Sequence, residues 1–460
     1  MALLLRRFAF AILATLALPP ALFAEDAKPV LSDPETGLAR YVARPEPVYG
    51  WELKEKSEGS GVTIYKLELI SQTWHDVVWK HVLYVYEPQN VTFHDHAILF
   101  VSGGSQLKPP GMDEQLLAVG IANMSGGRVA LLKQVPNQPL FDDRVEDDLI
   151  TETWLRYLQT GDDTWPLLFP MVKSAVKAMD AVKELGEKEG WPKPVEKFVI
   201  TGASKRGWTS WLTPAADSRI VATAPCVIDT LNFRAQMKYQ IESWGKFSEQ
   251  IDDYSSKGLI RTKDDEETPR ETALRTMMDP WTYRQQVAIP KLIINGTNDR
   301  YWVVDAAKNY FGDLVGPKYV LEIPNAGHNL KDGIPKVQAT IAALFRHVAS
   351  GMSMPQVEWS FTESDSGDRR ISMTSNPPAE SGRLWTATSA NNDFREATWT
   401  DRPLKKEGDR FEIQIPAAPG QGVATFGELR FIDRTIEPPL PYSLTTTVKR
   451  YAGGEATAKE

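Results

Sequence analysis

The chain has 460 residues, of which 42% are hydrophobic and 24% are charged, and its formal net charge is −8. This is the composition of a globular protein, and the length suits two or three domains. The acidic balance and the lack of a basic stripe exclude nucleic acid as an expected partner. The single cysteine, Cys226, excludes an internal disulfide, so the fold must be stabilised by packing.

The first 24 residues have the pattern of a secretory signal peptide. Arg6 and Arg7 precede an apolar run over residues 8–18, and small residues lead up to Ala24. We therefore expect cleavage after Ala24 and an exported mature chain that has no membrane span. An uncleaved membrane anchor is the alternative, although the apolar run is short for a spanning helix and a proline pair interrupts it.

Apolar strands alternate with helical segments through the middle of the chain. The predicted strands are residues 62–70, 79–86, 96–101, 128–135, 195–201, 220–228, 291–295 and 319–323. The predicted helices are residues 149–158, 166–185 and 335–348, together with a segment that follows Ser204. This alternation predicts an α/β fold with a mostly parallel sheet that is covered on both faces. Ligand sites in such folds lie beyond the carboxyl ends of the strands.

Two further regions flank or interrupt the α/β domain, which we place at residues 25–353. A charged insertion at about residues 229–290 predicts a helical cap, with a solvated surface excursion as the alternative. Short alternating runs separated by turn residues predict a small β-sandwich over residues 354–451. Its predicted strands are 357–361, 371–374, 384–389, 396–399, 411–415 and 429–432. Residues 452–460 are expected to form a disordered tail.

A serine lies at the bend between a predicted strand and a predicted helix. Gly202 ends the strand, Ser204 follows two residues later, and the helix begins directly afterwards. This is the pattern of the nucleophile elbow of α/β-hydrolases, in which a tight turn lifts the serine hydroxyl above the sheet. The usual second glycine, two residues after the serine, is Arg206 here, and Gly207 comes one residue later.

The chain also provides an acid and a histidine in the order that this fold requires. Asp299 follows the predicted strand 291–295, and His328 follows the predicted strand 319–323. The sequence therefore predicts a triad in which Ser204 attacks, His328 takes its proton and Asp299 orients the histidine. Asp229, after the preceding strand, is the alternative acid.

Backbone groups near the elbow predict an oxyanion hole. The N–H of Lys205, the residue after the serine, is one expected donor, and Gly103 or Gly104 after the strand 96–101 provides the other. That glycine pair is alternatively only a turn. His94-Asp95-His96 offers two histidines, which are too few for a metal site, so we expect no metal and no cofactor.

Several stretches together resemble one known family. LFVSGGSQ, LLKQVPNQPL, GASKRGWTSW, INGTNDRYWVVDA and NAGHNL follow one another in the chain, with GRLWTATS and NDFREATW further on. They are similar to the PhoPQ-activated pathogenicity-related family of the PqaA type. The resemblance implies an α/β-hydrolase fold, a bacterial source and export to the periplasm or medium. It also implies that Ser204, Asp299 and His328 are the catalytic residues, and that the Arg206–Gly207 spacing is normal for the family.

Two classes of function follow from these observations. The first is an exported serine hydrolase that cleaves an ester or amide in a small molecule, a carbohydrate ester or a peptide. The second is a catalytically silent binding or signalling protein, because a distant branch of the family is described as secreted autocrine proliferation repressors. Trp208, Trp211 and Trp302 lie close in sequence to the triad, where they form either a substrate platform or part of the core.

Overall fold

The computed structural model describes residues 34–105, 108–261, 267–365, 368–416, 418 and 420–451. The predicted signal peptide and the predicted disordered tail lie outside these residues, so both stay predictions. All described residues belong to one structural unit, Ser32–Glu460. Among the helices within it, none combines the length and the apolar character that a bilayer span requires.

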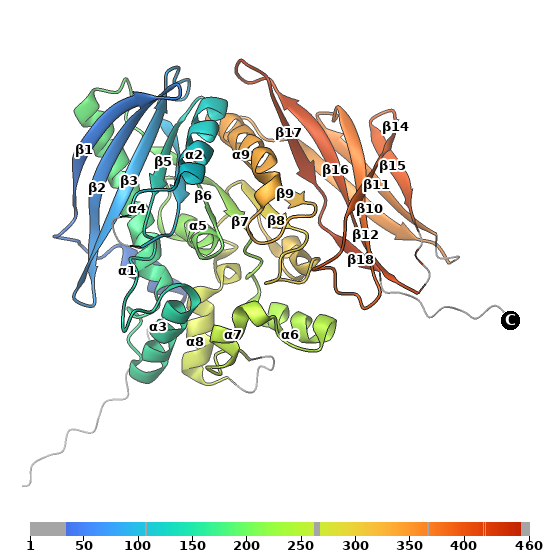
Figure 1. Ribbon diagram of the computed structural model, residues 1–460, viewed down its shortest axis with the longest axis horizontal. Helices are drawn as coiled ribbons and strands as arrows, with labels where there is room; N and C mark the ends of the chain where they lie inside the picture. Colours follow the sequence, from blue (N-terminus) through green and yellow to red (C-terminus); the bar gives the residue numbers. More distant parts are fainter. Residues whose placement is uncertain are drawn as a thin grey trace, which may run out of the picture. The chain divides into compact units, whose positions relative to one another are not determined.

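A mixed sheet of 14 described strands runs through this unit (Figure 1). Its strands are β1 (Gly50–Gly59), β2 (Val62–Trp74), β3 (Val77–Pro88), β4 (His96–Val101), β5 (Arg128–Leu132), β6 (Lys197–Ala203), β7 (Ile220–Cys226), β8 (Lys291–Gly296), β9 (Lys318–Ile323), β12 (Ser381–Ser389), β13 (Thr400–Pro403), β16 (Gly422–Asp433), β17 (Leu440–Thr445) and β18 (Lys449–Tyr451). The order is β1-β2-β3-β5-β4-β6-β7-β8-β9-β17-β16-β12-β13, with β18 paired to β16. The predicted α/β fold is therefore confirmed.

The sheet is parallel only in its centre, from β5 to β9. The strands β1, β2 and β3 at one end and those beyond β9 at the other pair antiparallel. The expectation of a mostly parallel sheet holds for this centre but not for the sheet as a whole. Alternation along a strand shows that the strand is half-buried, but it does not show which neighbour the strand pairs with.

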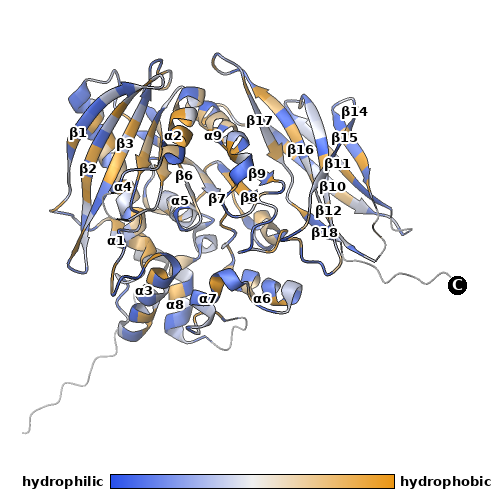
Figure 2. Ribbon diagram, viewed as in Figure 1, coloured by the Kyte–Doolittle hydropathy of each residue, from blue (hydrophilic) through white to orange (hydrophobic). Residues whose placement is uncertain are grey.

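Helices cover both faces of the central strands. They are α1 (Pro34–Val42), α2 (Met112–Ser125), α3 (Glu146–Thr160), α4 (Leu168–Glu189), α5 (Lys205–Ala216) and α9 (Ile334–Ala349), with the short helices η4 (Ala306–Asn309), η5 (Phe311–Asp313) and η6 (Lys331–Gly333). Leu99 of β4 belongs to the core under α4 and α5, whereas its neighbour Ile98 belongs to the core under α2 and α9. Because neighbouring residues belong to cores on opposite faces, the parallel strands are buried on both sides. Figure 2 shows the hydropathy of the residues along the strands.

The insertion between β7 and β8 is largely helical. It contains α6 (Phe233–Trp244), η1 (Glu249–Ile251), α7 (Asp252–Ser255), α8 (Pro269–Met278) and η3 (Pro280–Tyr283), and residues 262–266 lie outside the described residues. The side chain of Thr268 accepts from the N–H of Glu271, and the Glu271 side chain bonds back to the N–H of Thr268. This capping box fixes the start of α8 after the charged run. The helices α7 and α8 both contact α3, and a role of the insertion as a cap stays a prediction.

The region beyond residue 354 forms two facing sheets, of which only one is separate from the central sheet. The separate sheet has the order β10-β11-β15-β14, with β10 (Gln356–Glu363), β11 (Arg369–Asn376), β14 (Lys405–Glu407) and β15 (Arg410–Ile415). The other strands extend the central sheet, because Thr445 of β17 pairs with Val320 of β9. A β-sandwich as a domain of its own is therefore not confirmed, and the division at residue 354 stays a prediction.

The two sheets approach each other closely. A Cβ added to Gly427 of β16 would lie 2.1 Å from Sδ of Met373 on β11, so this position has room for glycine alone. The predicted strand 396–399 is wrong: these residues form a loop, and β13 begins at Thr400. The backbone groups of this loop bond to side chains of two other loops instead of to a neighbouring strand.

Candidate active site

Ser204 occupies a sharp bend between β6 and α5. Its φ of 56° and ψ of −124° are unusual for a residue with a side chain. A Cβ on Gly202 would lie 2.7 Å from the backbone oxygen of Arg206, and a Cβ on Gly207 would lie 2.9 Å from the oxygens of Gly202 and Cys226. Both glycines are needed because strand and helix approach this closely. The bend therefore accommodates a serine with its glycine at position 207 rather than 206.

Asp299 and His328 meet beyond the ends of β8 and β9. Oδ2 of Asp299 lies 2.8 Å from Nδ1 of His328, and Oδ1 accepts from the N–H of Tyr301 at 2.8 Å. Asp299 is only 7% exposed. Nε2 of His328 is shielded from solvent and finds no hydrogen-bond partner among the described residues. The carboxylate thus fixes the ring through one nitrogen and leaves the other available.

Ser204 and His328 line the same cavity, whose volume is about 420 Å³. Its other walls are mainly apolar or aromatic, and they include Trp208, Ile228, Phe233, Ile251, Tyr254, Ile260 and Trp302. Of the three tryptophans that the sequence singled out, Trp208 and Trp302 line the cavity, whereas Trp211 lies in the core.

A polar cluster that the sequence analysis missed lies at one side of the cavity. Asp147, from the first turn of α3, accepts from Nζ of Lys205 and from the hydroxyl of Tyr254, each at 3.0 Å. The hydroxyl of Tyr301 lies 3.5 Å from the same carboxylate, and its ring stacks on His328 with centroids 4.3 Å apart. Burial and the nearby Asp147 raise the pKa of Tyr301, so its hydroxyl stays protonated. The only sequence signal was the position of Tyr301, two residues after Asp299.

The residue that interrupts the usual elbow pattern has a structural partner. The guanidinium of Arg206 donates two hydrogen bonds of 2.8 Å to Glu146, and its Nε donates to the carbonyl of Val135 at 2.6 Å. Burial opposes ionisation of Glu146, but Arg206 and Lys205 outweigh this effect and lower its pKa to about 2. The pair therefore stays charged and ties the start of α5 to α3.

The predicted oxyanion-hole residues are not all brought to the cavity. Lys205 begins α5, so its N–H is among the amide groups that a helix leaves without an internal partner, and the residue lines the cavity. A Cβ on Gly103 would lie 2.3 Å from the guanidinium of Arg206, and Gly104, with a φ of +107°, lies beside Lys133. In the part of the chain that is described, neither glycine lines the cavity. A second donor from Gly103 or Gly104 stays a prediction.

The alternative acid, Asp229, has other partners. Both its oxygens accept from Nδ2 of Asn295 at 3.1 Å, and the hydroxyl of Tyr310 donates to Oδ1. Burial raises the pKa of Asp229 to about 6. The structure thus brings Asp299, rather than Asp229, to His328.

The His94-Asp95-His96 stretch lies away from these residues. His96 bonds through Nδ1 to Asp95 at 2.8 Å, and its ring packs against Phe345 of α9. The described ranges hold no cluster of three side chains that could bind a metal ion.

Comparison with known proteins agrees with the sequence resemblance. The sequence profile of the PhoPQ-activated pathogenicity-related protein family matches residues 38–395. Autocrine proliferation repressor protein A from Dictyostelium discoideum is 33% identical over 391 residues, which cover 80% of this chain and 77% of that protein.

Solved esterase structures are also similar to the chain at low identity. Acetyl xylan esterase 1 from Thermoanaerobacterium sp. JW/SL YS485 has 13% identity and a TM-score of 0.46, and the match covers 67% of this chain and 93% of that one. The acetyl xylan esterase from Paenibacillus sp. R4 has 13% identity and a TM-score of 0.45, over 66% of this chain and 92% of that one. On the profile match and the 33% identical relative, the chain belongs to the PhoPQ-activated pathogenicity-related protein family.

Proposed function

We propose that this protein is an exported serine hydrolase of the α/β-hydrolase fold that cleaves an ester or amide bond. The observation that carries the proposal is the buried Nε2 of His328, which has no hydrogen-bond partner among the described residues and lies in a cavity that Ser204 also lines, with Asp299 bonded to the opposite nitrogen. A neutral imidazole held in this way is a general base for a serine hydroxyl. The bend that carries Ser204 supports its role as the nucleophile.

The reaction would proceed in two halves. Ser204 Oγ attacks the substrate carbonyl while Nε2 of His328 takes its proton, and the proton then passes to the leaving alcohol or amine as the acyl-enzyme forms. Water then repeats the sequence, with His328 as base, and releases the acid. Asp299 stabilises the imidazolium in both halves, and the N–H of Lys205 would donate to the oxyanion. No metal or cofactor takes part in this scheme.

The lining of the cavity favours substrates with an apolar acyl group. Trp208, Phe233 and Trp302 would surround that group. A carbohydrate ester or a short peptide would keep its polar part outside.

The leader Arg6–Ala24 motivates periplasmic or extracellular localisation, with Glu25 as the mature N-terminus. N-terminal sequencing of the functional protein should find Glu25, and an intact Met1 or Ala2 would refute cleavage.

The test is a panel of acyl nitrophenyl esters and aminoacyl arylamides on the pure mature chain. We expect turnover of at least one class, and Ser204→Ala should lower it by several orders of magnitude, because a triad acts as a unit. Ser210→Ala is the matched control: this serine lies in the same helix and donates only to the carbonyl of Arg206. Equal turnover by the wild type and Ser204→Ala would refute Ser204 as the nucleophile.

A signalling role without catalysis is the second candidate, and the 33% identical relative that is named a proliferation repressor supports it. This candidate predicts no turnover of either substrate class by the wild-type chain. It also predicts that Ser204→Ala keeps its full biological effect. The serine-hydrolase proposal predicts the opposite in both experiments.

A further inference from the structure

One loop beyond the α/β strands contacts both loops that carry the proposed acid and base. This 389–399 loop joins β12 to β13. It lies at least 60 residues away in sequence from His328 and further from Asp299. Its backbone groups bond to the side chains of two asparagines, one on each triad loop.

The first asparagine is Asn298, directly before Asp299. Its Nδ2 lies 2.7 Å from the carbonyl oxygen of Ala397, 3.2 Å from that of Arg395 and 3.5 Å from that of Phe394. Its Oδ1 accepts from the hydroxyl of Thr297 at 2.8 Å, which sets the direction in which the amide nitrogen points. The position of the acid is therefore tied to the 389–399 loop through the preceding side chain.

The second asparagine is Asn325, three residues before His328. Its Nδ2 donates to the carbonyl of Trp399 at 2.9 Å, and its Oδ1 accepts from the N–H of Trp399 at 2.7 Å. This two-bond pairing imitates the bonding of a neighbouring strand. Asn325 has a φ of 58°, a region that asparagine tolerates better than most residues. The chain turns here towards His328.

The two triad loops also contact each other. The N–H of Asn298 donates to the carbonyl of Ala326 at 2.9 Å. A Cβ added to Gly296 would lie 2.4 Å from that same carbonyl oxygen, so the backbones are packed as closely as glycine permits. A shift of one loop is therefore passed to the other.

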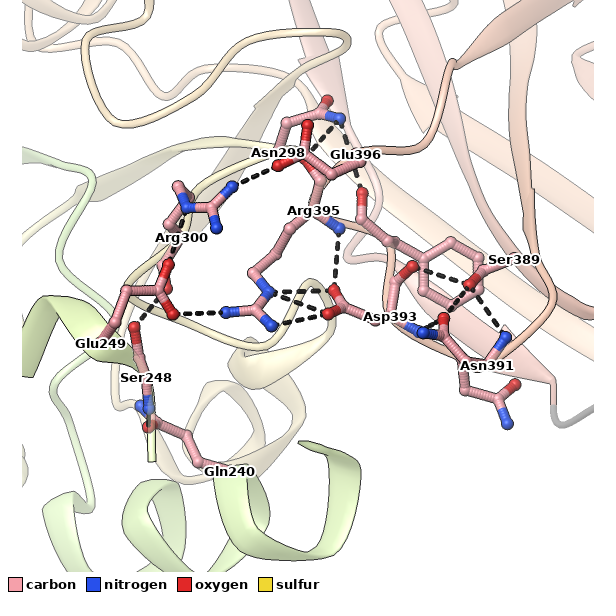
Figure 3. Close-up of polar contacts among 12 residues, drawn as sticks. Gln240, Ser248, Glu249, Asn298, Arg300, Ser389, Asn391, Asp393, Arg395 and Glu396 are labelled. Atoms are coloured by element: carbon pink, nitrogen blue, oxygen red, sulfur yellow. Dashed lines mark hydrogen bonds and ion pairs between the residues drawn. The ribbon is translucent and has the colours of Figure 1, made fainter. Parts of the chain in front are cut away.

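The 389–399 loop is itself firmly held. Phe394 and Trp399 are buried in a small apolar cluster with Ala424, Phe426 and Val448. The guanidinium of Arg395 bonds to both oxygens of Asp393, at distances from 2.6 to 3.1 Å. Figure 3 shows this pair beside Asn298. The loop thus offers a fixed row of carbonyl groups.

A third region joins the same network. Glu249 of the insertion accepts from Arg395 at 3.0 Å and from Arg300, the residue after Asp299, at 2.8 Å. Arg300 also bonds to Glu396 (Figure 3). The two ion pairs of Arg300 are largely exposed, so we expect them to contribute less than the asparagine contacts.

We propose that the 389–399 loop sets the geometry between Asp299 and His328, with Asn298 and Asn325 as positioning residues. The inference rests on the proposed function, because it assigns these residues to its acid and base. Without the Asn298 amide, the Asp299 carboxylate would be free to shift away from Nδ1 of His328. The imidazole would then lose its orientation in the cavity that Ser204 also lines, and a displacement of about 1 Å is enough to lower a rate about 100-fold.

The experiment compares Asn298→Ala, Asn298→Asp and Asn325→Gly with the wild type. Aspartate keeps the shape of the side chain but cannot donate to the three carbonyls, and glycine keeps the positive φ while it removes both bonds. Asn123→Ala is the matched control, because Nδ2 of that exposed asparagine donates to the carbonyl of Ser60, on the opposite part of the sheet. We expect kcat to fall about 10- to 100-fold in the three variants with KM within about twofold, and the control to match the wild type.

A second measurement needs no substrate. The proton on Nδ1 of His328 should give a downfield NMR signal in the wild type, identified by its loss in His328→Ala. The signal should weaken or shift in the Asn298 and Asn325 variants and stay unchanged in Asn123→Ala. Folded variants with wild-type kcat and an unchanged signal would overturn the positioning role. If the wild type itself turns over nothing, the proposed function fails, while the NMR comparison still decides whether the loop sets the Asp299–His328 geometry.

Discussion

The bend at Ser204, which we propose to be a nucleophile elbow, and the two loops that carry Asp299 and His328 are held in place by different means. At the elbow, the glycines at 202 and 207 let β6 and α5 approach each other and the end of β7, so two glycines within six residues of sequence permit the bend. The acid and histidine loops instead depend on contacts with the 389–399 loop, far away in the sequence. The difference shows that a site can combine one residue whose position is set locally with two residues whose positions depend on a segment far away in the sequence. The two parts should therefore respond differently to mutation.

The largest effect on turnover should come from replacing one of the two candidate acids with asparagine. Asp299→Asn keeps the shape but favours the wrong tautomer of His328, so we expect turnover to fall by about 10⁴-fold. Asp229→Asn should change turnover by less than about tenfold, because Asp229 bonds to Asn295 and Tyr310. Steady-state kinetics on both folded variants checks this. A larger loss in Asp229→Asn than in Asp299→Asn would make Asp229 the acid.

An intermediate effect should come from substitutions at the elbow itself. A Cβ at position 207 would meet Cγ2 of Ile228 at 2.7 Å and two backbone oxygens at 2.9 Å. Gly207→Ala should therefore lower the free energy of unfolding by about 1–3 kcal/mol, as overpacking does, and reduce turnover as Ser204 is displaced. Gly59→Ala, where nothing lies within 4 Å, is the control. Thermal unfolding and kinetics that show no change in Gly207→Ala would mean that the bend is not locally determined.

The last effect concerns the pH dependence of stability rather than turnover. Burial raises the pKa of Asp229 from 3.8 to about 6, so the folded state holds its proton more tightly than the unfolded state does. This contribution is fully present below about pH 4 and is lost as the pH rises to about 6, which amounts to about 3 kcal/mol at 1.36 kcal/mol per unit. Asp279, whose pKa burial also raises to about 6, titrates in the same window.

Asp229→Asn should therefore flatten, but not abolish, the fall in unfolding free energy between pH 4 and pH 6. Urea unfolding at several pH values measures the difference between the variant and the wild type. Burial and the nearby Asp229 also raise the pKa of Glu322, so part of the change will come from that group. Identical slopes in the two proteins would contradict a buried, protonated Asp229.

The sequence predicted those parts of the site that are determined locally or by chain order. The bend at Ser204 was predicted from a strand, a glycine and a helix, and the meeting of Asp299 and His328 from their place after two strands; the catalytic roles of all three stay predictions. The roles of Asn298 and Asn325 were not predictable, because their partners are backbone carbonyls about 70 to 100 residues away. The strand expected at 396–399 failed for the same reason, since its backbone bonds to these side chains instead of to a strand.

The helices and strands also fall into those that the sequence predicted and those that it did not. The central strands and the helices α3, α4 and α9 were predicted from periodicity, whereas α1, α2 and β1 were not. The pairing of β17 with β9 could not be foreseen, because the edge that a strand joins depends on packing between distant residues. Asp147 was missed since a carboxylate in the first turn of a helix is common for electrostatic reasons alone.

The most direct test of the central claim is reaction of the mature protein with a small fluorophosphonate, followed by peptide mapping. A serine hydrolase whose His328 Nε2 removes the proton of Ser204 should be modified once per chain, at Ser204, and lose its turnover in proportion. Asp299→Asn should react far more slowly under the same conditions. A folded wild-type chain that stays unmodified, or that is modified at another serine while Ser204 remains free, would contradict the assignment.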